Sequence, residues 1–321
     1  MTSMNRISFL DTAKGLALLL MIIGHSPLPS CLELARSIIF IFHMPLFFIA
    51  SGYLMVNKKF DARKKFRKIV VPYIIIFILS IVPYYFKYND LSILWIFPLM
   101  KTRNMFGVNM SFGIGPCWFL PCYYFSNIFV RYLLFCKHCS QNWGGYICLI
   151  LFTLFYVISK EVNGLPFLLT QITLGSFFII CGQKVRTNNY LKNYRFVFIG
   201  IVSIIVCLLY GSFSMYSVEC KLWIIQLFAA VFLTLTIFEV VKKVKKALFF
   251  KWLSINSLTI LCIHSYDWSF DISASLLSYM NFGIYYTFFF YCGFILVTFF
   301  ILKGIKLLCI QVQSFAYKMD K

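Results

Sequence analysis

The first long hydrophobic stretch of the chain, FLDTAKGLALLLMIIGHSPLP at residues 9–29, carries three residues able to do ionic or acid–base chemistry: Asp11, Lys14 and His25. An ionisable residue at bilayer depth is costly, so it usually faces a protein interior and has a function there. In an α-helix, Lys14 and His25 lie on one face, roughly 16 Å apart along the axis, and Asp11 precedes Lys14 by one turn on the same stripe. The plain interpretations are an Asp11–Lys14 ion pair near the inner interface and a hydrated His25 near the outer one. The alternative is that the stripe lines a buried channel or an elongated ligand.

Two other hydrophobic stretches carry histidines. FIFHMPLFFIASGY places His43 at a depth similar to that of His25, so the two imidazoles either share a pocket or His43 is bonded singly to a backbone carbonyl. Near the C-terminus, NSLTILCIHSYDWSFD places His264, Asp267 and Asp271 at positions i, i+3 and i+7, on one face of a helix. Three ionisable groups on one face are hard to reconcile with lipid contact, so we expect an interior polar stripe.

The segment KKFDARKKFRK, residues 58–68, concentrates seven basic residues and one acid. Such a run commonly anchors a membrane protein at an anionic lipid surface. Its sharper interpretation is a cytoplasmic phosphate clamp, because a guanidinium group offers paired donors to phosphate oxygens. If the following helix begins early, Lys64 and Arg67 lie one turn apart and are able to grip one group together.

Two further segments carry weaker chemical signals. GIGPCWFLPCYY (113–124), which contains Trp118, is typical of an interfacial aromatic belt, with a platform for a sugar or a thioester as the alternative. Cys136 and Cys139 flank His138 in CKHC at a metal-like spacing, but no second pair lies at the spacing of a zinc finger. We interpret this pair as reduced thiols and expect no metal site.

The composition is that of a membrane protein. Of the 321 residues, 61% are hydrophobic and 12% are charged, whereas a soluble domain carries about a quarter charged residues. Hydrophobic stretches of roughly 17–25 residues, the length of a transmembrane helix, recur from end to end. The sequence therefore predicts an all-α polytopic membrane protein, a single bundle of about ten transmembrane helices. The expected spans are 7–25, 37–56, 69–86, 117–136, 144–159, 165–182, 196–212, 221–241, 255–272 and 284–303, and the shorter stretch 91–100 is expected to be interfacial or re-entrant.

Basic residues are distributed unevenly between the two sides of this layout. With the N-terminus inside, the inner segments hold 22 Lys and Arg residues and the outer segments hold 6, as the positive-inside rule expects. We therefore expect both termini in the cytoplasm, a first helix that is retained and not cleaved, and one membrane-embedded domain over 1–321. The net charge of +20 lies in short runs between spans, so it indicates contact with the lipid bilayer and topology, not a nucleic-acid partner.

Several of these stretches, taken together and in this order, resemble the acyltransferase-3 family of integral-membrane acyltransferases, and especially its branch similar to fucose 4-O-acetylases. RISFLDTAKGLALLLMIIGH resembles the family's first helix, in which Arg or Lys precedes a His by ten intervening residues. Lys14 and His25 have that spacing, and Asp11 stands where the family usually has Asp. FHMPLFFIASGYL resembles the second helix, KKFRKIVVPY the basic start of the third, GPCWFLPCYY the WFL segment and LTILCIHSYD the late YLLH-like stretch.

The resemblance implies an enzyme of the bacterial inner membrane that moves an acetyl group from cytoplasmic acetyl-CoA to a hydroxyl of a surface glycan or lipid-linked sugar. The family's Arg-x-x-Arg pair corresponds to Lys64 and Arg67, or to Arg63 and Arg67, and would hold the coenzyme phosphates. Lys14 would line the path of the pantetheine arm. His25 would act as the general base or carry the acyl group as a covalent relay.

The remaining polar residues are assigned supporting roles. We expect Asp11 to be a second catalytic residue that organises the coenzyme side together with Lys14. Candidates for substrate binding are His43, Trp118, His264 and Asp267.

Two other functions are compatible with a polytopic chain. A transporter or flippase of a lipid-linked sugar would use the same polar stripe as a translocation path, but the sequence contains no pair of broken helices in matching halves. A glycan polymerase would be expected to carry a large outer loop with Arg clusters, whereas the longest outer segment, 87–116, holds only Lys87, Lys101 and Arg103.

Overall fold

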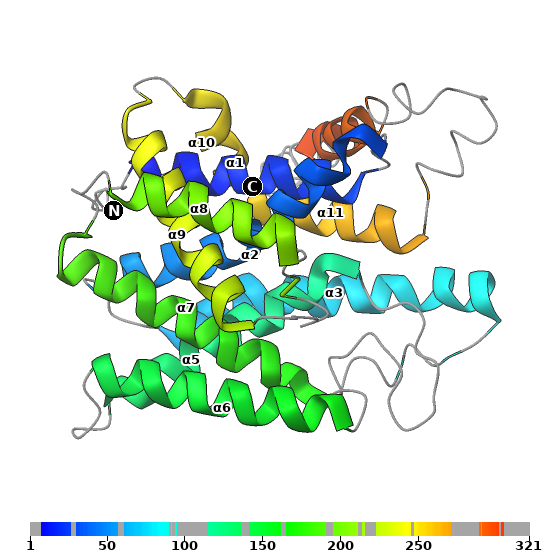
Figure 1. Cartoon of the computed structure of the whole chain (residues 1–321). Helices are drawn as coiled ribbons and strands as arrows, with labels where there is room; N and C mark the ends of the chain where they lie inside the picture. The colour runs from blue at the N-terminus through cyan, green and yellow to red at the C-terminus, as the bar shows by residue number, and fades with distance from the viewer. Residues whose placement is uncertain are drawn as a thin grey trace, which may run out of the picture.

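Hydrophobic α-helices dominate the protein, as the sequence predicts (Figure 1). The computed structural model describes residues 8–26, 30–56, 61–89, 91, 94, 115–135, 141–161, 165–190, 195–210, 214–215, 223–244, 247–270, 272, 289, 291–301 and 303–304, and these contain no strand. The helices are α1 (Ser8–His25), α2 (Glu33–Met55), α3 (Ala62–Tyr88), α5 (Phe119–Phe135), α6 (Gln141–Glu161), α7 (Leu169–Thr187), α8 (Arg195–Tyr210), α9 (Trp223–Lys242), α10 (Leu248–Ile255) and α11 (Ser257–Phe270). A further apolar helix covers Tyr291–Ile301, and short 3-10 turns η1 (Ser30–Leu32), η2 (Gly115–Trp118) and η3 (Pro166–Leu168) precede α2, α5 and α7.

Six helices of the described chain, α1, α2, α3, α6, α7 and α9, are long and apolar enough to cross a membrane, or seven if the bent pair of α10 and α11 forms one span. An all-α polytopic membrane protein is thus confirmed. The number of ten spans and the cytoplasmic placement of both termini stay predictions. The CKHC segment and nearly all of 91–100 lie outside the described residues.

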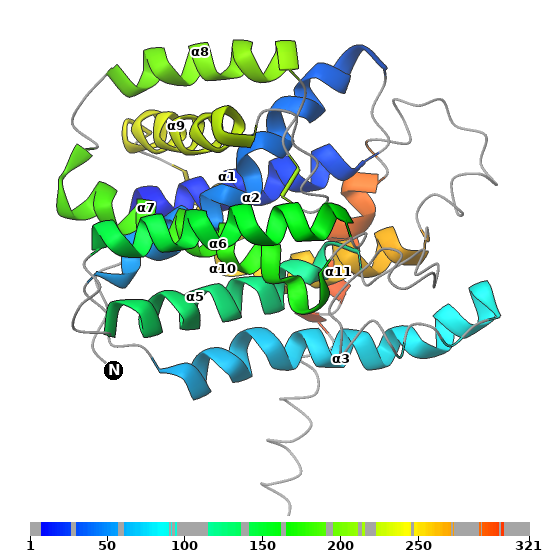
Figure 2. The same ribbon diagram turned by 60° about the horizontal axis from the view of Figure 1, so that its bottom comes forward.

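The helix α2 occupies the centre of the bundle, between α1, α7 and α9 in both views (Figures 1 and 2). Two glycines allow α2 and α7 to approach closely, because a Cβ atom at Gly52 would overlap the carbonyl group of Ile179 and one at Gly182 would overlap that of Ile49. Small residues commonly permit this kind of backbone approach between membrane helices. The contact fixes the position of α2, which carries His43.

A similar contact joins α1 to α10. A Cβ atom at Gly15 would overlap the carbonyl group of Phe250. The backbone of α10 therefore lies directly against α1 at Gly15, the residue after Lys14. From the sequence, residues 242–254 are expected to form an inner segment between spans, without a helix. After α10 the chain bends by 71° into α11, and the Asn256 side chain donates a hydrogen bond to the Trp252 carbonyl at 2.8 Å, which caps the end of α10.

The helix α3 begins at Ala62, earlier than the expected start at residue 69. Asp61 accepts a hydrogen bond from the backbone N–H of Lys64 at 2.9 Å, the usual role of an N-cap aspartate. The basic run is therefore helical from Ala62 onward. As a consequence, Lys64 and Arg67 lie one turn apart, as the early-start alternative required.

Basic residues gather at the end of the bundle where α1 begins. Lys242, at the end of α9, lies over the ring of Phe9 with 5.4 Å between its Nζ atom and the ring centroid. Arg186, at the end of α7, donates a hydrogen bond to the Tyr53 carbonyl at 2.9 Å. This is the arrangement that the positive-inside rule predicts for a cytoplasmic end.

Candidate active site

Three of the four histidines in the sequence lie together at the C-terminal end of α1. The ring centroid of His25, the last residue of α1, is 5.3 Å from that of His264 on α11 and 6.2 Å from that of His43 on α2. Phe40 closes the group, with ring centroids 5.2 Å from His25 and 5.4 Å from His43. We call His25, His43 and His264 the histidine cluster. Its three members come from three helices and from both ends of the chain.

Hydrogen bonds orient two of these rings. The Nδ1 atom of His43 lies 2.8 Å from the Ile39 carbonyl oxygen, and because a carbonyl only accepts, Nδ1 must carry the proton of the neutral ring. The Nδ1 atom of His264 lies 2.7 Å from the hydroxyl of Tyr291. Within the described residues, no group of three His, Cys, Asp or Glu side chains is arranged to hold a metal ion.

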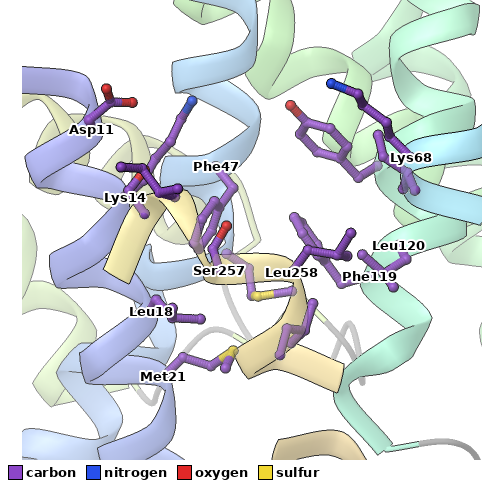
Figure 3. A pocket seen from close by; sticks show the side chains of 16 residues that line it. Asp11, Lys14, Leu18, Met21, Phe47, Lys68, Phe119, Leu120, Ser257 and Leu258 are labelled. Atoms are coloured by element: carbon purple, nitrogen blue, oxygen red, sulfur yellow. The ribbon is translucent and has the colours of Figure 1, made fainter. Parts of the chain in front are cut away.

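A cavity of about 370 Å³ extends along α1 from Lys14 past Leu18 to Met21, in the direction of His25. We call it the central cavity. It is lined by Asp11, Lys14, Leu18, Met21, Met44, Phe47, Lys68, Ile69, Phe119, Leu120, Tyr123, Ser254, Ile255, Ser257, Leu258 and Leu261. Figure 3 shows Lys14 and Lys68 on opposite walls at the end near Asp11, with Met21 at the other end. The cavity therefore has a charged mouth and an apolar far end.

The apolar end of the cavity stops about one helical turn before the histidine cluster. On α1 the last lining residue, Met21, precedes His25 by four positions, and on α11 Leu261 precedes His264 by three. On α2 the lining residue Met44 is the immediate neighbour of His43. A ligand that enters at Lys14 and extends along α1 is thus directed at the three imidazoles, roughly 16 Å from Lys14.

Comparison with known proteins agrees with this geometry. The model of the family described as "Acyltransferase domain", Acyl_transf_3, matches residues 7–303. The chain belongs to the acyltransferase-3 family. No curated protein and no solved structure matches the chain significantly. The matched range includes every helix that contributes to the cavity and to the histidine cluster, so both are features of the acyltransferase-3 domain of this chain.

The residues of this acyltransferase that were predicted to bind the coenzyme are divided between the cavity and the outer surface. Lys14 lines the central cavity. Arg63, Lys64 and Arg67 are exposed on the first turns of α3 and are not among the lining residues. The basic residue of α3 that lines the cavity is Lys68, which comes one turn after Lys64.

A second basic residue of α3 also turns inward. The Nζ atom of Lys65 donates a hydrogen bond to Oδ1 of Asn127 on α5 at 2.8 Å, and the Ser51 hydroxyl of α2 donates to the same atom at 2.8 Å. Lys65 and Lys68 therefore share the inward face of α3. Lys64 and Arg67 were the pair expected from the sequence, because nothing in the sequence shows which turn of α3 lies beside the cavity.

The remaining predicted residues are distributed as follows. Asp11 lines the cavity mouth and precedes His25 by 14 positions, roughly 21 Å along the axis, so the structure does not bring it to the histidine cluster. Trp118 is buried in η2, which packs against α11. Asp267 is buried one turn after His264, and Asp271 lies outside the described residues.

Sequence reasoning missed two residues of the site. Lys68 was part of the basic run but was not chosen, and the N-cap aspartate Asp61 was the signal that would have set the start of α3. Tyr291 lies in the run FFFYCGF, where nothing distinguishes it from the aromatic residues beside it.

Proposed function

We propose that the protein is a bacterial inner-membrane O-acetyltransferase that moves an acetyl group from cytoplasmic acetyl-CoA to a hydroxyl of a surface glycan or lipid-linked sugar. The observation that carries this proposal is the central cavity, which extends from a basic mouth to within about one helical turn of a cluster of three buried or half-buried imidazoles. An acyl-CoA needs such a site, because its charged phosphates and its reactive thioester are at opposite ends of a long, flexible arm. The fucose 4-O-acetylase-like branch is our more specific assignment, on the sequence resemblance.

The coenzyme would bind with its phosphates at the mouth of the cavity. Lys14 and Lys68 face the mouth from opposite walls (Figure 3), and ammonium groups bind phosphate by charge-assisted hydrogen bonds. Arg63, Lys64 and Arg67 are exposed nearby and would raise the local concentration of the anionic coenzyme by long-range attraction. Asp11 would orient Lys14 and would not take part in the chemical step.

The pantetheine arm would extend along α1 past Leu18 and Met21. Both side chains are apolar and buried, so they offer water no hydrogen bonds along the passage, and a site from which water is excluded would protect a thioester from hydrolysis. At its far end, the acyl carbon would reach the histidine cluster.

His25 is the residue we assign to the proton transfer. A neutral imidazole takes the proton of the attacking sugar hydroxyl as the new C–O bond forms, and it returns that proton to the coenzyme thiolate when the C–S bond breaks. Transfer by way of an acyl-imidazole is the alternative, in which His25 itself attacks the thioester. His43 is held by Ile39 with its proton on Nδ1, which leaves its Nε2 as an acceptor for an acceptor-sugar hydroxyl, the substrate-binding role expected for it.

A transporter of a lipid-linked sugar is the competing function, and the family assignment favours acyl transfer over it. The two functions differ in their need for acetyl-CoA. The test uses purified protein in lipid nanodiscs with radiolabelled acetyl-CoA and bacterial glycan lipids as acceptors. We expect label in the glycan with the wild type and not with His25→Ala. We expect Tyr146→Phe, a change at an exposed residue of α6, to retain transfer.

A folded wild type that neither binds acetyl-CoA nor labels any glycan lipid would refute the proposal in favour of transport. Normal transfer by a folded His25→Ala protein would refute the role of His25 alone.

A further inference from the structure

His264 and Tyr291 form a hydrogen-bonded pair, and general base catalysis by His25 assigns no role to this pair. His264 is fully buried and Tyr291 is 5% exposed, and the Tyr291 hydroxyl lies 2.7 Å from Nδ1 of His264. The two residues belong to α11 and to the Tyr291–Ile301 helix. The hydrogen bond therefore fixes the orientation of the His264 ring from a second helix.

The direction of this hydrogen bond follows from the needs of the Tyr291 hydroxyl. A buried tyrosine O–H normally finds a hydrogen-bond partner, and this hydroxyl lies at hydrogen-bond distance from Nδ1 of His264. A phenol proton left buried without an acceptor costs about 1–3 kcal/mol, so we take Tyr291 as the donor to Nδ1. The proton of the neutral His264 ring is then on Nε2.

The Nε2 atom of His264 is free to act on a ligand. It is buried and has no hydrogen-bond partner among the described residues. A buried N–H without a partner is uncommon in proteins and calls for an explanation. Because the His264 ring centroid is 5.3 Å from that of His25, a reacting group in contact with His25 would also be within reach of His264.

We propose that His264 donates its Nε2–H to the thioester carbonyl oxygen when that oxygen becomes an oxyanion, and that Tyr291 is the positioning residue that holds the required tautomer. This role rests on the acyl transfer proposed above. When the sugar oxygen attacks, the carbonyl π electron pair moves to oxygen, and the negative charge is stabilised by the N–H of His264. When the tetrahedral intermediate collapses, the C=O bond forms again, the C–S bond breaks, and His264 keeps its proton throughout.

The two histidines thus have opposite protonation requirements. His25 must present a lone pair to accept the hydroxyl proton, and His264 must present a proton to the oxyanion. A neutral histidine used as an electrophile next to a separate base is a known catalytic arrangement. Here the hydrogen bond from Tyr291 is the feature that distinguishes one imidazole from the other.

The test combines the tautomer with the kinetics. With only four histidines in the chain, ¹⁵N-histidine labelling of the protein in lipid gives few ring signals, and the His264 signals are those absent from His264→Gln. We expect protonated Nε2 and unprotonated Nδ1 for His264 in the wild type, and a mixture of tautomers in Tyr291→Phe. We expect His264→Ala to lower kcat about 100- to 1,000-fold with little change in the KM for acetyl-CoA.

The remaining variants separate a positioning role from a merely structural one. His264→Gln should restore part of kcat, because its amide supplies a donor. The double variant His264→Ala/Tyr291→Phe should be no slower than His264→Ala, because Tyr291 acts through His264, and the exposed Tyr146→Phe on α6 serves as the matched control. The inference would be overturned if wild-type His264 carried its proton on Nδ1. It would also be overturned if the loss of kcat caused by Tyr291→Phe added to the loss caused by His264→Ala. Neither result would contradict acyl transfer itself. Absence of any transfer by the wild type would overturn the proposed function and this role with it.

Discussion

Removal of the charge of Lys68 should weaken acetyl-CoA binding, and removal of the charge of Lys64 should not. Both lysines are exposed residues of α3, four positions apart, but only Lys68 lines the central cavity. A hydrogen bond to a charged group contributes about 1.5–3 kcal/mol. Because Lys68 is at a hydrated mouth, where solvent screens the interaction, we take about 1–2 kcal/mol, which is roughly a 5- to 30-fold rise in Kd.

The matched variant Lys64→Ala removes the same charge from the same helix without touching the cavity. Its loss of screened, long-range attraction should be about 0.5 kcal/mol or less, or roughly twofold in Kd. The measurement is equilibrium binding of radiolabelled acetyl-CoA to each folded variant in nanodiscs. If Lys64→Ala weakens binding as much as Lys68→Ala, or if neither changes the Kd, the phosphates do not bind at the mouth of the central cavity.

Two further predictions concern the contacts that shape the site. Gly52→Ala should lower the thermal stability by the equivalent of about 1–3 kcal/mol, because the new Cβ atom would overlap the Ile179 carbonyl. Gly293→Ala, whose added group has no atom of the described residues beyond its own helix within 4 Å, should leave the Tm unchanged or raise it. Equal Tm values would contradict the close α2–α7 contact. Leu258→Trp should fill the middle of the central cavity and abolish acetyl transfer while the protein still binds a coenzyme A fragment that lacks the pantetheine arm, as measured by competition, and retained transfer would show that the acyl arm takes another path.

The sequence was sufficient to predict the class of the protein and the first helix of the site. The period of the α-helix placed Lys14 and His25 on one stripe, and Leu18 and Met21 of the same stripe line the cavity between them. The depth of His43 was also predictable, because the second expected span begins on the side of the membrane where the first one ends at His25, and the two rings are 6.2 Å apart.

The parts that could not be predicted depend on how the helices turn and pack. Lys64 and Lys68 lie one turn apart on the same stripe of α3. The position of α3 along the bundle, which the contact of Lys65 with Asn127 helps to fix, decides which of them lines the cavity. The helix α10 is eight residues long and lies among basic residues, so it has the composition of an inner segment. Its position comes from the fit of Gly15 against Phe250, which leaves no periodic signal in the sequence. The pairing of His264 with Tyr291 joins two distant helices, so spacing along the chain does not indicate it.

The central claim is that the acyl end of the coenzyme reaches the histidine cluster through the cavity that begins at Lys14 and Lys68. The most direct test is to bind a coenzyme A analogue that carries a photoreactive acyl group to the wild type in nanodiscs, irradiate it, and map the modified residues by mass spectrometry. We predict modification within one helical turn of His25, His43 or His264, and its loss when unlabelled acetyl-CoA competes. Competable modification confined to the lipid-facing surfaces of α6 and α8, or to the mouth at Lys14, would contradict the claim.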